Sequence, residues 1–476
     1  MKPQTSTDLH SLFNPKSIAV VGASTKRGYT WDSGNAYING CIRQSFAGRI
    51  FPVHPKAESI LGYKCYRSIL DIPEPVDLAV FCVRASSARN VMEACARKGV
   101  RFVHMLTAGF GETGQAANAD IEKGIMAIAR KAGIRVVGPN CMGLYCPEGG
   151  LAWNGELPDK PGSVGLFSQS GQLANMVVKV GSIEGIHFSK AVSFGNACDL
   201  QAHDFLSYMA DDPKTTIIAS YLEGLKNGRA FFETAKKMTR NKPLVVWKGG
   251  QTEGGARATR SHTAALAGSF QIWKGMCRQT GIISVDTLDE MVHTLSALKR
   301  LPLPQGLNAA ILGGAGGGSV TMTDMAEKQG LGVPRLSDET IERLETIIPV
   351  QGSSVKNPLD ILPYLANKDS FKFLMTLLKE DPRVDALFFT LPLAFIYRER
   401  GQAGVNAYLK ITLRAREWLE KPMFLIIESF NTPELMILCR EASERLMTHQ
   451  VPVFPSFEVA ARVMLNLKGY HDFLTR

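Results

Sequence analysis

The sequence predicts an α/β protein in which a Rossmann-type unit is followed by two flavodoxin-like, doubly wound units. Short apolar runs alternate with amphipathic helical stretches along the chain. The runs are continuous rather than alternating, which is typical of parallel strands covered on both faces. A length of 476 residues, 45% of them hydrophobic, corresponds to about two to four globular domains. We expect the domains to span residues 1–148, 149–303 and 304–476.

The first unit is predicted from apolar runs that are separated by helical patterns at Ala88–Lys98 and Ala119–Ala132. Each run is short enough to be a strand, and the helical stretches between them provide the crossovers of a parallel sheet. The expected strands are Ser17–Val21, Arg49–Val53, Leu78–Val83, Phe102–Leu106 and Arg135–Val137.

The second and third units share a sequence pattern. Lys242-Pro243 precedes an apolar run in the second unit, and Lys421-Pro422 precedes one in the third. Near the end of each unit a short apolar run leads into a helix, at Leu288–Leu298 and at Phe457–Leu467. The pattern indicates two related folds. Their expected strands are Ser163–Phe167, Phe188–Val192, Thr216–Tyr221, Pro243–Trp247 and Ile282–Val285, then Ala309–Leu312, Ala386–Leu391 and Phe424–Ile427.

Charge and cysteine content exclude several classes of protein. The net charge is +10, but Lys and Arg are scattered, whereas a nucleic-acid surface needs them clustered. The apolar stretch Ala386–Tyr397 contains Pro392 and is too short for a membrane helix, so we expect a buried strand that runs into a loop. Residues Met1–His10 are too polar for a signal peptide. Nine Cys without metal-ligand spacing indicate reduced thiols in a cytoplasmic protein and no metal site.

A glycine loop, Gly22–Gly28, follows the first expected strand. It is either a tight turn without a ligand or a phosphate-binding turn at a helix N-terminus. The NAD fingerprint is missing, because the loop has no GxGxxG and no acidic residue follows about 20 residues later. Instead, Lys56 follows the second strand, where a cation favours a phosphate. The loop and Lys56 therefore suit coenzyme A, with its diphosphate and 3′-phosphate, better than NAD.

A series of motifs resembles the CoA-binding domain of succinyl-CoA synthetase alpha subunits and ADP-forming acetate–CoA ligases, within the NDP-forming acyl-CoA synthetase superfamily. The motifs are Ser17–Ser24, Gly48–Val53 with Pro55-Lys56, Leu61-Gly62, Pro75–Ala79, Thr107–Glu112 and Gly138–Gly143. The resemblance covers nearly the whole chain. Two departures, His54 for the usual Asn and Arg84 for a frequent Pro, lie near the expected CoA site. The CoA-binding residues that the resemblance implies are Gly22, Ala23, Ser24, Lys56, Val83, Arg84, Asn140 and Cys141.

The segment Ser261–Gly268 (SHTAALAG) contains the candidate nucleophile, His262. An imidazole is largely unprotonated near neutral pH and can attack phosphorus, although a histidine in a Gly/Ser/Thr-rich loop can also be merely exposed. The segment resembles the phosphohistidine loop of these ligases. This implies that His262 carries a phosphoryl group from a nucleotide to an acyl phosphate. Glu223 follows a strand, and it is either the carboxylate that orients His262 or an exposed loop residue.

Two further loops, Ser168–Gly171 and Gly313–Gly318, each follow a strand and open a helix. They are either close-packed turns or anion sites at helix N-termini. The resemblance favours anion sites beside the phosphohistidine, and it places the acyl substrate near the motifs Ser193–Asn196 and Asn357–Asp360. The predicted phosphate-binding residues are Ser168, Ser170, Gly171, Gly314, Gly316 and Gly317, and the predicted substrate residues are Asn196, Asn357 and Asp360.

The three predicted units leave no room for the ATP-grasp fold that an ADP-forming acyl-CoA synthetase needs. We therefore expect a separate ATP-grasp beta subunit, most simply in a heterotetramer, which supplies ATP/ADP and Mg²⁺. The expected substrates are a small carboxylic acid, phosphate and CoA, with no nucleic-acid or membrane partner. Two alternatives stay open: a non-catalytic CoA-sensing regulatory protein and an NAD-dependent oxidoreductase. The sequence does not identify the acid.

Overall fold

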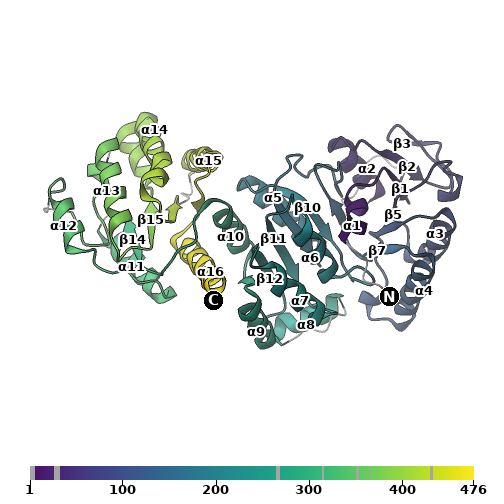
Figure 1. The fold of residues 1–476 in the computed structure, drawn as a ribbon. Helices are drawn as coiled ribbons and strands as arrows, with labels where there is room; N and C mark the ends of the chain where they lie inside the picture. Colours follow the sequence, from purple (N-terminus) through teal and green to yellow (C-terminus); the bar gives the residue numbers. More distant parts are fainter. Residues whose placement is uncertain are drawn as a thin grey trace. The chain divides into compact units, whose positions relative to one another are not determined.

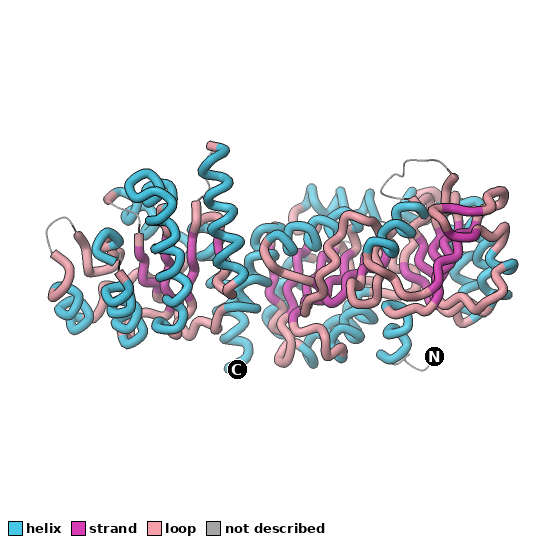
Figure 2. Tube along the Cα trace, turned by 90° about the horizontal axis from the view of Figure 1, so that it is seen from above, coloured by secondary structure: helices cyan, strands magenta, loops and turns pink. Residues whose placement is uncertain are grey.

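The computed structural model describes residues 6–25, 33–263, 269–313, 316–349, 353–365, 367–428 and 432–476, and it describes their side chains except at 6–8 and 260–263. The chain forms two compact units, Met1–Asp286 and Thr287–Arg476. The first unit contains two largely parallel sheets and the second unit contains one, each with helices on both faces (Figures 1 and 2). The predicted fold class is confirmed. No helix in the described ranges is long and apolar enough to cross a membrane.

The first sheet is parallel and has the strand order β2-β1-β5-β6-β7. Its central strands are buried along their whole length, which explains the continuous apolar runs in the sequence. Right-handed crossovers place α2 on one face and α3 and α4 on the other. The strands are β1 (Ser17–Val21), β2 (Arg49–Val53), β5 (Leu78–Phe81), β6 (Phe102–Met105) and β7 (Arg135–Val137). The accompanying elements are α1 (Ser6–Phe13), α2 (Gly34–Arg43), β3 (Ser59–Ile60), β4 (Tyr63–Lys64), η1 (Ile69–Asp71), α3 (Ala85–Lys98), η2 (Gly111–Thr113) and α4 (Ala116–Ala132).

The second sheet has the order β13-β12-β11-β9-β10-β8, and only β8 runs antiparallel, against β10. Strand β8 joins this sheet although its residues precede the predicted boundary at 148/149. That boundary and the one at 303/304 stay predictions. The strands are β8 (Gly143–Tyr145), β9 (Val164–Ser168), β10 (Phe188–Ser193), β11 (Ile217–Leu222), β12 (Leu244–Lys248) and β13 (Ile283–Val285). The helices are α5 (Gly171–Ile183), α6 (Ala202–Asp211), α7 (Gly228–Met238), α8 (Glu253–Thr263) and α9 (Phe270–Thr280).

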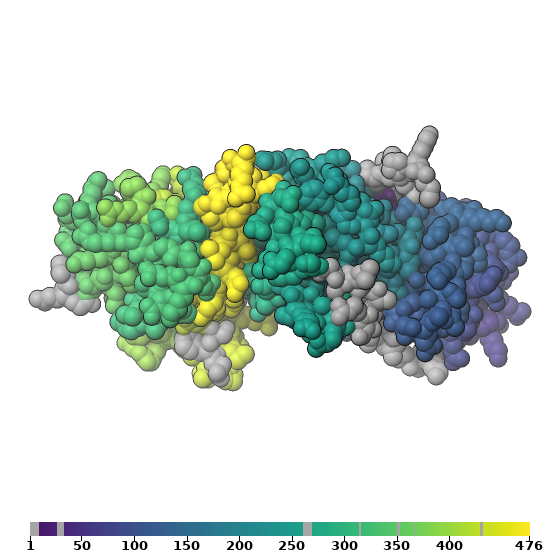
Figure 3. Space-filling view, turned by 90° about the horizontal axis from the view of Figure 1, so that it is seen from below, coloured from purple at the N-terminus to yellow at the C-terminus, as the bar shows by residue number. Residues whose placement is uncertain are grey.

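The third sheet has the order β14-β15-β16-β17 and lies in the second unit. Helices α12 to α15 pack on one face, while α10, α11 and α16 pack on the other. Figure 3 shows α16 in yellow at the surface of this unit. The strands are β14 (Ala309–Leu312), β15 (Ala386–Thr390), β16 (Met423–Ile426) and β17 (Val453–Phe454). The helices are α10 (Leu288–Arg300), α11 (Gly317–Gln329), α12 (Asp338–Glu345), η3 (Leu362–Leu365), α13 (Lys368–Glu380), α14 (Leu393–Leu419), α15 (Pro433–Thr448) and α16 (Phe457–Thr475).

Two local predictions were wrong. The stretch after β15 is not a loop, because α14 begins at Leu393 directly after Pro392. Proline has a fixed φ and needs no N–H partner, so it is well suited to the start of a helix. The backbone of His262 was expected in a loop, but α8 continues to Thr263. The glycines near the start of α8 suggested a loop, yet they do not break the helix.

The repeat between the second and third sheets is visible in matching lysine contacts. Lys242 Nζ donates to the carbonyls of Met209 (3.1 Å) and Asp212 (2.7 Å). Lys421 Nζ donates to the carbonyls of Leu378 and Asp381, both at 2.8 Å. Each lysine thus binds the carboxyl end of the helix before the preceding strand, where a cation is favoured. Burial lowers the pKa of both lysines.

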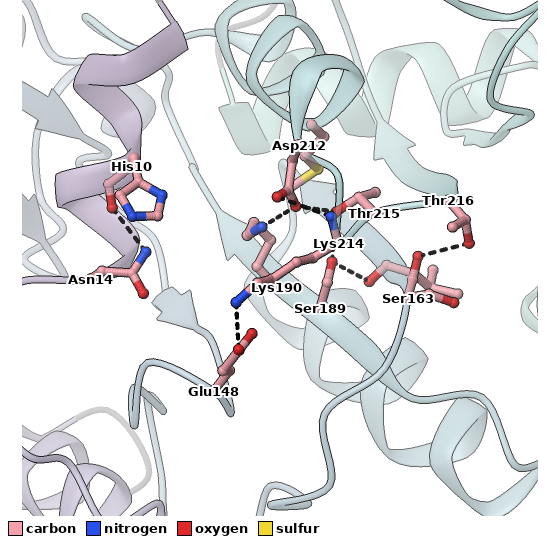
Figure 4. Close-up of polar contacts among 12 residues, drawn as sticks. His10, Asn14, Glu148, Ser163, Ser189, Lys190, Asp212, Lys214, Thr215 and Thr216 are labelled. Atoms are coloured by element: carbon pink, nitrogen blue, oxygen red, sulfur yellow. Dashed lines mark hydrogen bonds and ion pairs between the residues drawn. The ribbon is translucent and has the colours of Figure 1, made fainter.

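A buried ion pair between Lys190 on β10 and Asp212 supports the second sheet (Figure 4). The hydroxyl of Thr215 donates to the Asp212 carboxylate at 2.6 Å, and the hydroxyl oxygens of Ser189 and Thr215 lie 2.7 Å apart. The Lys190 ammonium also lies 5.2 Å from the centroid of the Tyr208 ring. Burial would raise the pKa of Asp212, but the hydrogen bonds from Lys190 and Thr215 outweigh it and lower that pKa.

The substitution Lys190→Met should lower the free energy of unfolding by about 3–5 kcal/mol, because it leaves the Asp212 carboxylate buried without its cation. Urea denaturation at pH 7 measures the effect. In the natural protein the depressed pKa of Asp212 stabilises the fold above the unfolded-state value of about 3.9, and this contribution is lost as pH falls through the folded-state pKa. Lys123→Met, which breaks the exposed pair with Asp120, should cost less than about 1 kcal/mol. Equal losses in the two variants would contradict the assignment.

Candidate active site

Several of the predicted site residues of the first unit lie where the strand order of a sheet reverses. In the first sheet the chain moves from β1 outward to β2 and then back past β1 to β5. In the second sheet it moves from β9 to β10 and then back to β11. Loops that leave neighbouring strands at such a reversal diverge to opposite faces and open a crevice at the carboxyl ends of the strands. Gly22–Ser24 and Cys82–Arg84 flank the first crevice, and Ser168–Gly171 and Glu223-Gly224 flank the second.

Glu223 is buried directly after β11, and its carboxylate accepts a hydrogen bond from the Tyr221 hydroxyl at 3.4 Å. Gln169 links this loop to the loop after β9. The side-chain oxygen of Gln169 accepts from the backbone N–H groups of Glu223 (2.5 Å) and Gly224 (3.0 Å). The backbone N–H of Gln169 donates to the Tyr221 carbonyl at 3.1 Å. Gln169 was not predicted as a site residue, although it lies inside the predicted motif. The structure therefore brings the candidate carboxylate beside the candidate anion loop.

A buried cation lies behind the Glu223 loop. Lys248, the last residue of β12, donates from Nζ to the carbonyl of Glu223 at 2.8 Å and to the carbonyl of Gly249. Burial lowers the pKa of Lys248, and the neighbouring Glu223 opposes this effect. A Cβ at position 249 would lie 2.5 Å from the Tyr221 hydroxyl, so only glycine permits this approach. Through these contacts the Glu223 loop is held against the segment that leads from β12 into α8, with Tyr221, Lys248 and Gly249 as the contacting residues.

The loop Ser168–Gly171 is shaped by its own hydroxyl groups. Ser168 Oγ donates to the Ser170 carbonyl (2.7 Å) and accepts from the Ser170 N–H (3.2 Å), while Ser170 caps α5 by accepting from the Leu173 N–H at 3.3 Å. A Cβ on Gly171 would lie 2.3 Å from Met142 Cγ, so the glycine permits close packing against the segment after Cys141. Because both hydroxyls and the N–H groups of Gln169 and Ser170 are used within the protein, the better candidates for binding an anion are the N–H groups of the first turn of α5, from Gly171 onward.

The first crevice is formed by close backbone contacts. Gly22 has φ +97°, and a Cβ there would lie 2.5 Å from the Cys82 carbonyl oxygen. Ala23 is buried, and Ser24 is held by Asn35 on α2, which accepts from the Ser24 N–H (2.9 Å) and donates to its carbonyl (2.8 Å). Asn35 was missed in the sequence because it lies outside the glycine loop. The predicted loop residues therefore line the carboxyl edge of the sheet as expected.

The departure at His54 preserves a local turn. His54 Nδ1 accepts from the N–H groups of Lys56 (3.2 Å) and Ala57 (3.1 Å), as the side-chain oxygen of an Asn would in the same position. This contact requires the ring nitrogen to be unprotonated. The Lys56 side chain is exposed. Arg84, the second departure, is exposed at the start of α3 and makes no capping bond there.

Thr107 holds the remaining CoA candidates together. Its hydroxyl donates to the Val83 carbonyl at 2.9 Å, and its own carbonyl accepts from the Asn140 N–H at 3.0 Å. Cys141 is buried, its thiol lies 3.4 Å from the Met105 carbonyl, and burial raises the pKa of that thiol. A buried neutral thiol is a packing group, so a ligand is more readily bound here by the backbone than by the sulfur.

Asn196 connects the two sheets of the first unit. Its amide nitrogen donates to carboxylate oxygens of Glu112 (2.6 Å) and Glu122 (3.2 Å), and its oxygen accepts from the Asn140 amide at 3.4 Å. Burial would raise the pKa of Glu112, but the hydrogen bonds from Asn196 and from the N–H groups of Gly109 and Phe110 lower it overall. The amide predicted to bind substrate therefore also bridges two carboxylates, neither of which was predicted as a site residue.

The candidate nucleophile is placed only through its backbone. His262 lies in the last turn of α8, which runs beside η2, the short helix that contains Glu112. The side chain of His262 and the whole of Gly314 lie outside the described residues. Among the residues that are described, no group of three or more His, Cys, Asp or Glu side chains could hold a metal ion.

In the second unit the described strands lie in sequence order, β14-β15-β16-β17, and a segment at Leu359 bridges the free side of β14 before the chain reaches β15. Asp360 accepts from the Gly316 N–H at 3.2 Å and so orders the glycine loop before α11. A Cβ at Gly316 or Gly317 would meet no atom within 4 Å, which leaves their backbone accessible. Asn357 accepts from the Ile311 N–H (2.9 Å) and donates to the carbonyls of Ala309 (2.9 Å) and Pro334 (2.8 Å). These contacts use its amide fully and assign it a positioning role, so a direct contact with substrate stays an untested prediction.

Each unit also contains a sizeable cavity near these loops. In the first unit a cavity of about 510 Å³ lies between α7 and α9, with Lys248, Phe232 and Trp273 in its wall. In the second unit a cavity of about 450 Å³ opens beside Gly313 and Gly318. Both volumes are in the range of about 300–1,000 Å³ that is typical of small-molecule sites.

Comparison with known proteins agrees with this architecture. A family model described as a CoA binding domain matches residues 16–147, and one described as a succinyl-CoA ligase like flavodoxin domain matches residues 161–298. The alpha subunit of ADP-forming acetate–CoA ligase II from Pyrococcus furiosus is 39% identical over 382 residues, which cover 80% of this chain and 81% of the relative. The alpha subunit of ligase I from the same organism is 34% identical and covers 96% of this chain and 97% of the relative.

A solved structure supports the same grouping over the full length. Dinucleotide forming acetyl-coenzyme A synthetase 1 from Ca. Korarchaeum cryptofilum, in complex with phosphate and ADP, superposes with a TM-score of 0.81 at 29% identity and covers 98% of this chain and 97% of that chain. The matches confirm the resemblance read from the motifs and favour neither an NAD-dependent oxidoreductase nor a CoA-sensing regulator. The chain belongs to the family of ADP-forming acetate–CoA ligases, which are acid–thiol ligases.

Proposed function

We propose that this chain is the CoA-binding, phosphohistidine-bearing subunit of an ADP-forming acyl-CoA synthetase, which joins a carboxylate to CoA with ATP and releases ADP and phosphate. The observation that carries the proposal is the crevice between β9 and β11. There a buried carboxylate, Glu223, is fixed by Tyr221 and Gln169 beside the N-terminus of α5. The helix that contains His262 begins just after Gly249, which Lys248 joins to the same loop.

The proposed role of each group follows from charge. Transfer of the phosphoryl group to His262 forms an N–P bond and breaks the bond to ADP, and it leaves positive charge on the imidazole. Glu223 accepts a hydrogen bond from the other ring nitrogen and balances that charge. Backbone N–H groups at Ser168–Gly171 and at Gly314, Gly316 and Gly317 bind the phosphoryl oxygens, those of Ser170 and Gly316 in exchange for their contacts with Ser168 and Asp360. A carboxylate then takes the phosphoryl group, and the CoA thiol displaces phosphate from the acyl phosphate.

CoA is assigned to the crevice between β1 and β5. The backbone of Gly22, Ala23 and Ser24 can approach the diphosphate closely, and Lys56 adds a cation at the exposed end of β2. Val83, Arg84, Asn140 and Cys141 complete the proposed contacts from the neighbouring loops. The amide of Asn196 connects this crevice to the ligase site through Glu112, so it is proposed to act in positioning as well as in substrate binding.

ATP, ADP and Mg²⁺ are assigned to an ATP-grasp beta subunit, in a heterotetramer in the cytoplasm. Support comes from the two Pyrococcus furiosus relatives, which are named as alpha subunits. The proposed domains are 1–148 for CoA binding, 149–303 for the phosphohistidine segment, and 304–476 for the second ligase domain. Asn357 and Asp360 are assigned to the acyl site of the last domain.

Incubation of the chain with phosphate and a panel of acyl-CoAs should add one phosphoryl group to His262 by the reverse half-reaction. Intact mass at neutral or alkaline pH measures it, because phosphohistidine is labile in acid. The variant His262→Ala should show no adduct, whereas His449→Ala, which changes an exposed histidine after α15, should be phosphorylated normally. An adduct that persists in His262→Ala would contradict the assignment.

Replacement of Glu223 by Gln should slow phosphorylation about 10- to 100-fold, because the neutral amide cannot balance the imidazolium charge. Quenched-flow sampling with intact-mass detection gives the rate. Glu233→Gln, on the outer face of α7, is the matched control and should leave the rate unchanged. CoA affinity should be the same in both variants. A rate in Glu223→Gln equal to that of the control would remove Glu223 from the mechanism.

The variant Lys56→Ala should weaken CoA binding about 10-fold, which corresponds to about 1.4 kcal/mol, if a charge-assisted contact to a phosphate is lost. Calorimetric titration of CoA measures Kd. Lys131→Ala, an exposed lysine at the end of α4, should bind CoA as the natural protein does. An unchanged Kd in Lys56→Ala would place the phosphates elsewhere.

A further inference from the structure

The cavity of about 510 Å³ between α7 and α9 has no part in the function proposed above. Its volume is in the range that is typical of small-molecule sites. Gly224 and Leu225, the two residues after Glu223, form one side of it, and Lys248 at the end of β12 forms another. The cavity therefore lies at the carboxyl edge of the second sheet, where open α/β sheets bind ligands.

Two glycines leave this cavity open. Gly275 lies in the middle of α9, Gly228 lies at the start of α7, and both line the cavity. A Cβ built on either residue would meet no atom within 4 Å, so no neighbouring group requires a glycine there. Glycine inside a helix lowers stability relative to residues that have a side chain. The space is therefore not required by packing, and at Gly275 it is left open at the expense of helix stability.

The walls of this cavity are mainly apolar and partly aromatic. Phe232 comes from α7, and Trp273 and Met276 come from α9. The indole N–H of Trp273 donates to the Ser284 hydroxyl oxygen at 3.1 Å, so its polar atom is already bound by the protein. Ile272, on the same wall, is 75% exposed. A ligand that fits these walls needs a large apolar body, and a flat aromatic body can also stack on the rings.

A buried cation lies at the inner end of this cavity. Among the described residues that line it, Lys248 is the only charged one, and it is 6% exposed. Its contacts with the carbonyls of Glu223 and Gly249 use two of its three N–H donors, so the third can take a further acceptor. Burial lowers the pKa of Lys248, and an anion in the cavity would stabilise its charged form.

The two helices beside the cavity add positive charge. On α7, Arg229 pairs with Glu233, whereas the exposed Lys236 adds a further cation. Helix α9 carries Lys274 and Arg278, both exposed, and its sequence contains no acidic residue. The charge around the cavity therefore attracts an anion and repels a cation.

We propose that this cavity is a further small-molecule site, separate from the CoA and phosphoryl sites, which binds a compound with a flat apolar body and one anionic group. The anionic group contacts Lys248, and the apolar body lies between α7 and α9. Gly224 and Leu225 are part of the same wall, so the ligand touches the loop that holds Glu223. The inference does not rest on the proposed function, because binding needs no phosphoryl transfer.

The test is fluorescence titration of the full chain with anilinonaphthalene sulfonate, an aromatic compound with one sulfonate group. Saturable binding is expected. The variant Gly275→Leu fills the cavity and should weaken this binding at least about 10-fold, which is a loss of most of the apolar contact. Leucine is the better helix former, so the variant should melt no lower than the natural protein. Gly469→Leu is the matched control, because Gly469 is an exposed glycine of α16 with an equally open Cβ position, and it should bind the probe normally.

A second variant tests the anionic group. Lys248→Met should weaken binding of the sulfonate about 10-fold, because a charge-assisted contact is lost, and it should leave binding of phenylnaphthylamine, which has the same rings without the sulfonate, unchanged. If Gly275→Leu binds the sulfonate as tightly as Gly469→Leu does, the inference is overturned. It is also overturned if Lys248→Met changes neither compound's Kd or weakens both equally. These outcomes hold whether or not His262 becomes phosphorylated, so the inference and the proposed function can fail separately.

Discussion

The right-handed crossover between parallel strands is the constraint on which the rest of this structure depends. Because the crossover has one hand, a chain that reverses its direction across a sheet must send its helices to opposite faces. The first two sheets contain such a reversal, at β1/β5 and β9/β11, and in the third a short segment at Leu359 bridges β14 on the side away from β15 before the chain continues to β15. Each reversal is followed by a glycine-containing loop. At these points neighbouring loops leave the carboxyl edge of the sheet in opposite directions. The topology therefore explains why the sequence motifs, the buried Glu223 and the cavity of the second unit lie at carboxyl edges.

The second and third sheets are built on one plan. The series β9, β11, β12 and β13 corresponds to β14, β15, β16 and β17, and Lys242 and Lys421 bind the same kind of helix end in each. The third sheet has no partner like β10 among its described strands. Leu359 pairs with Leu312 in that position, and Asn357 secures it through the backbone of β14. A short segment at Leu359, held by hydrogen bonds to β14, thus takes the place of a strand. It brings Asp360 to the Gly316 N–H, just before α11.

The sequence predicts the strands well, because strands that are buried on both faces consist of continuous runs of apolar residues. Four of them, β1, β2, β7 and β14, have the expected bounds. It predicts less of the site. The missed residues act through contacts between loops that are distant in sequence. Asn196 and Glu112, for example, are 84 residues apart. The missed residues are Gln169, Asn35, Glu112 and Glu122. No local pattern marks such pairs. The helical backbone at His262 was missed for a different reason, since tertiary packing overrides the low helix propensity of Gly, Ser and Thr.

The bridge at Asn196 also has a thermodynamic consequence. The side-chain amide of Asn196 donates to Glu112 on η2 and Glu122 on α4, and its backbone N–H donates to the Pro139 carbonyl at 3.0 Å, so the loop after β10 is joined to loops of the first sheet. A ligand that shifts this amide from one side changes the free energy available on the other. Linkage is reciprocal: whatever factor a ligand on one side of this amide imposes on binding at the other side, a ligand there must impose on the first. Any coupling that passes through this amide is therefore equal in both directions, whichever side is occupied first.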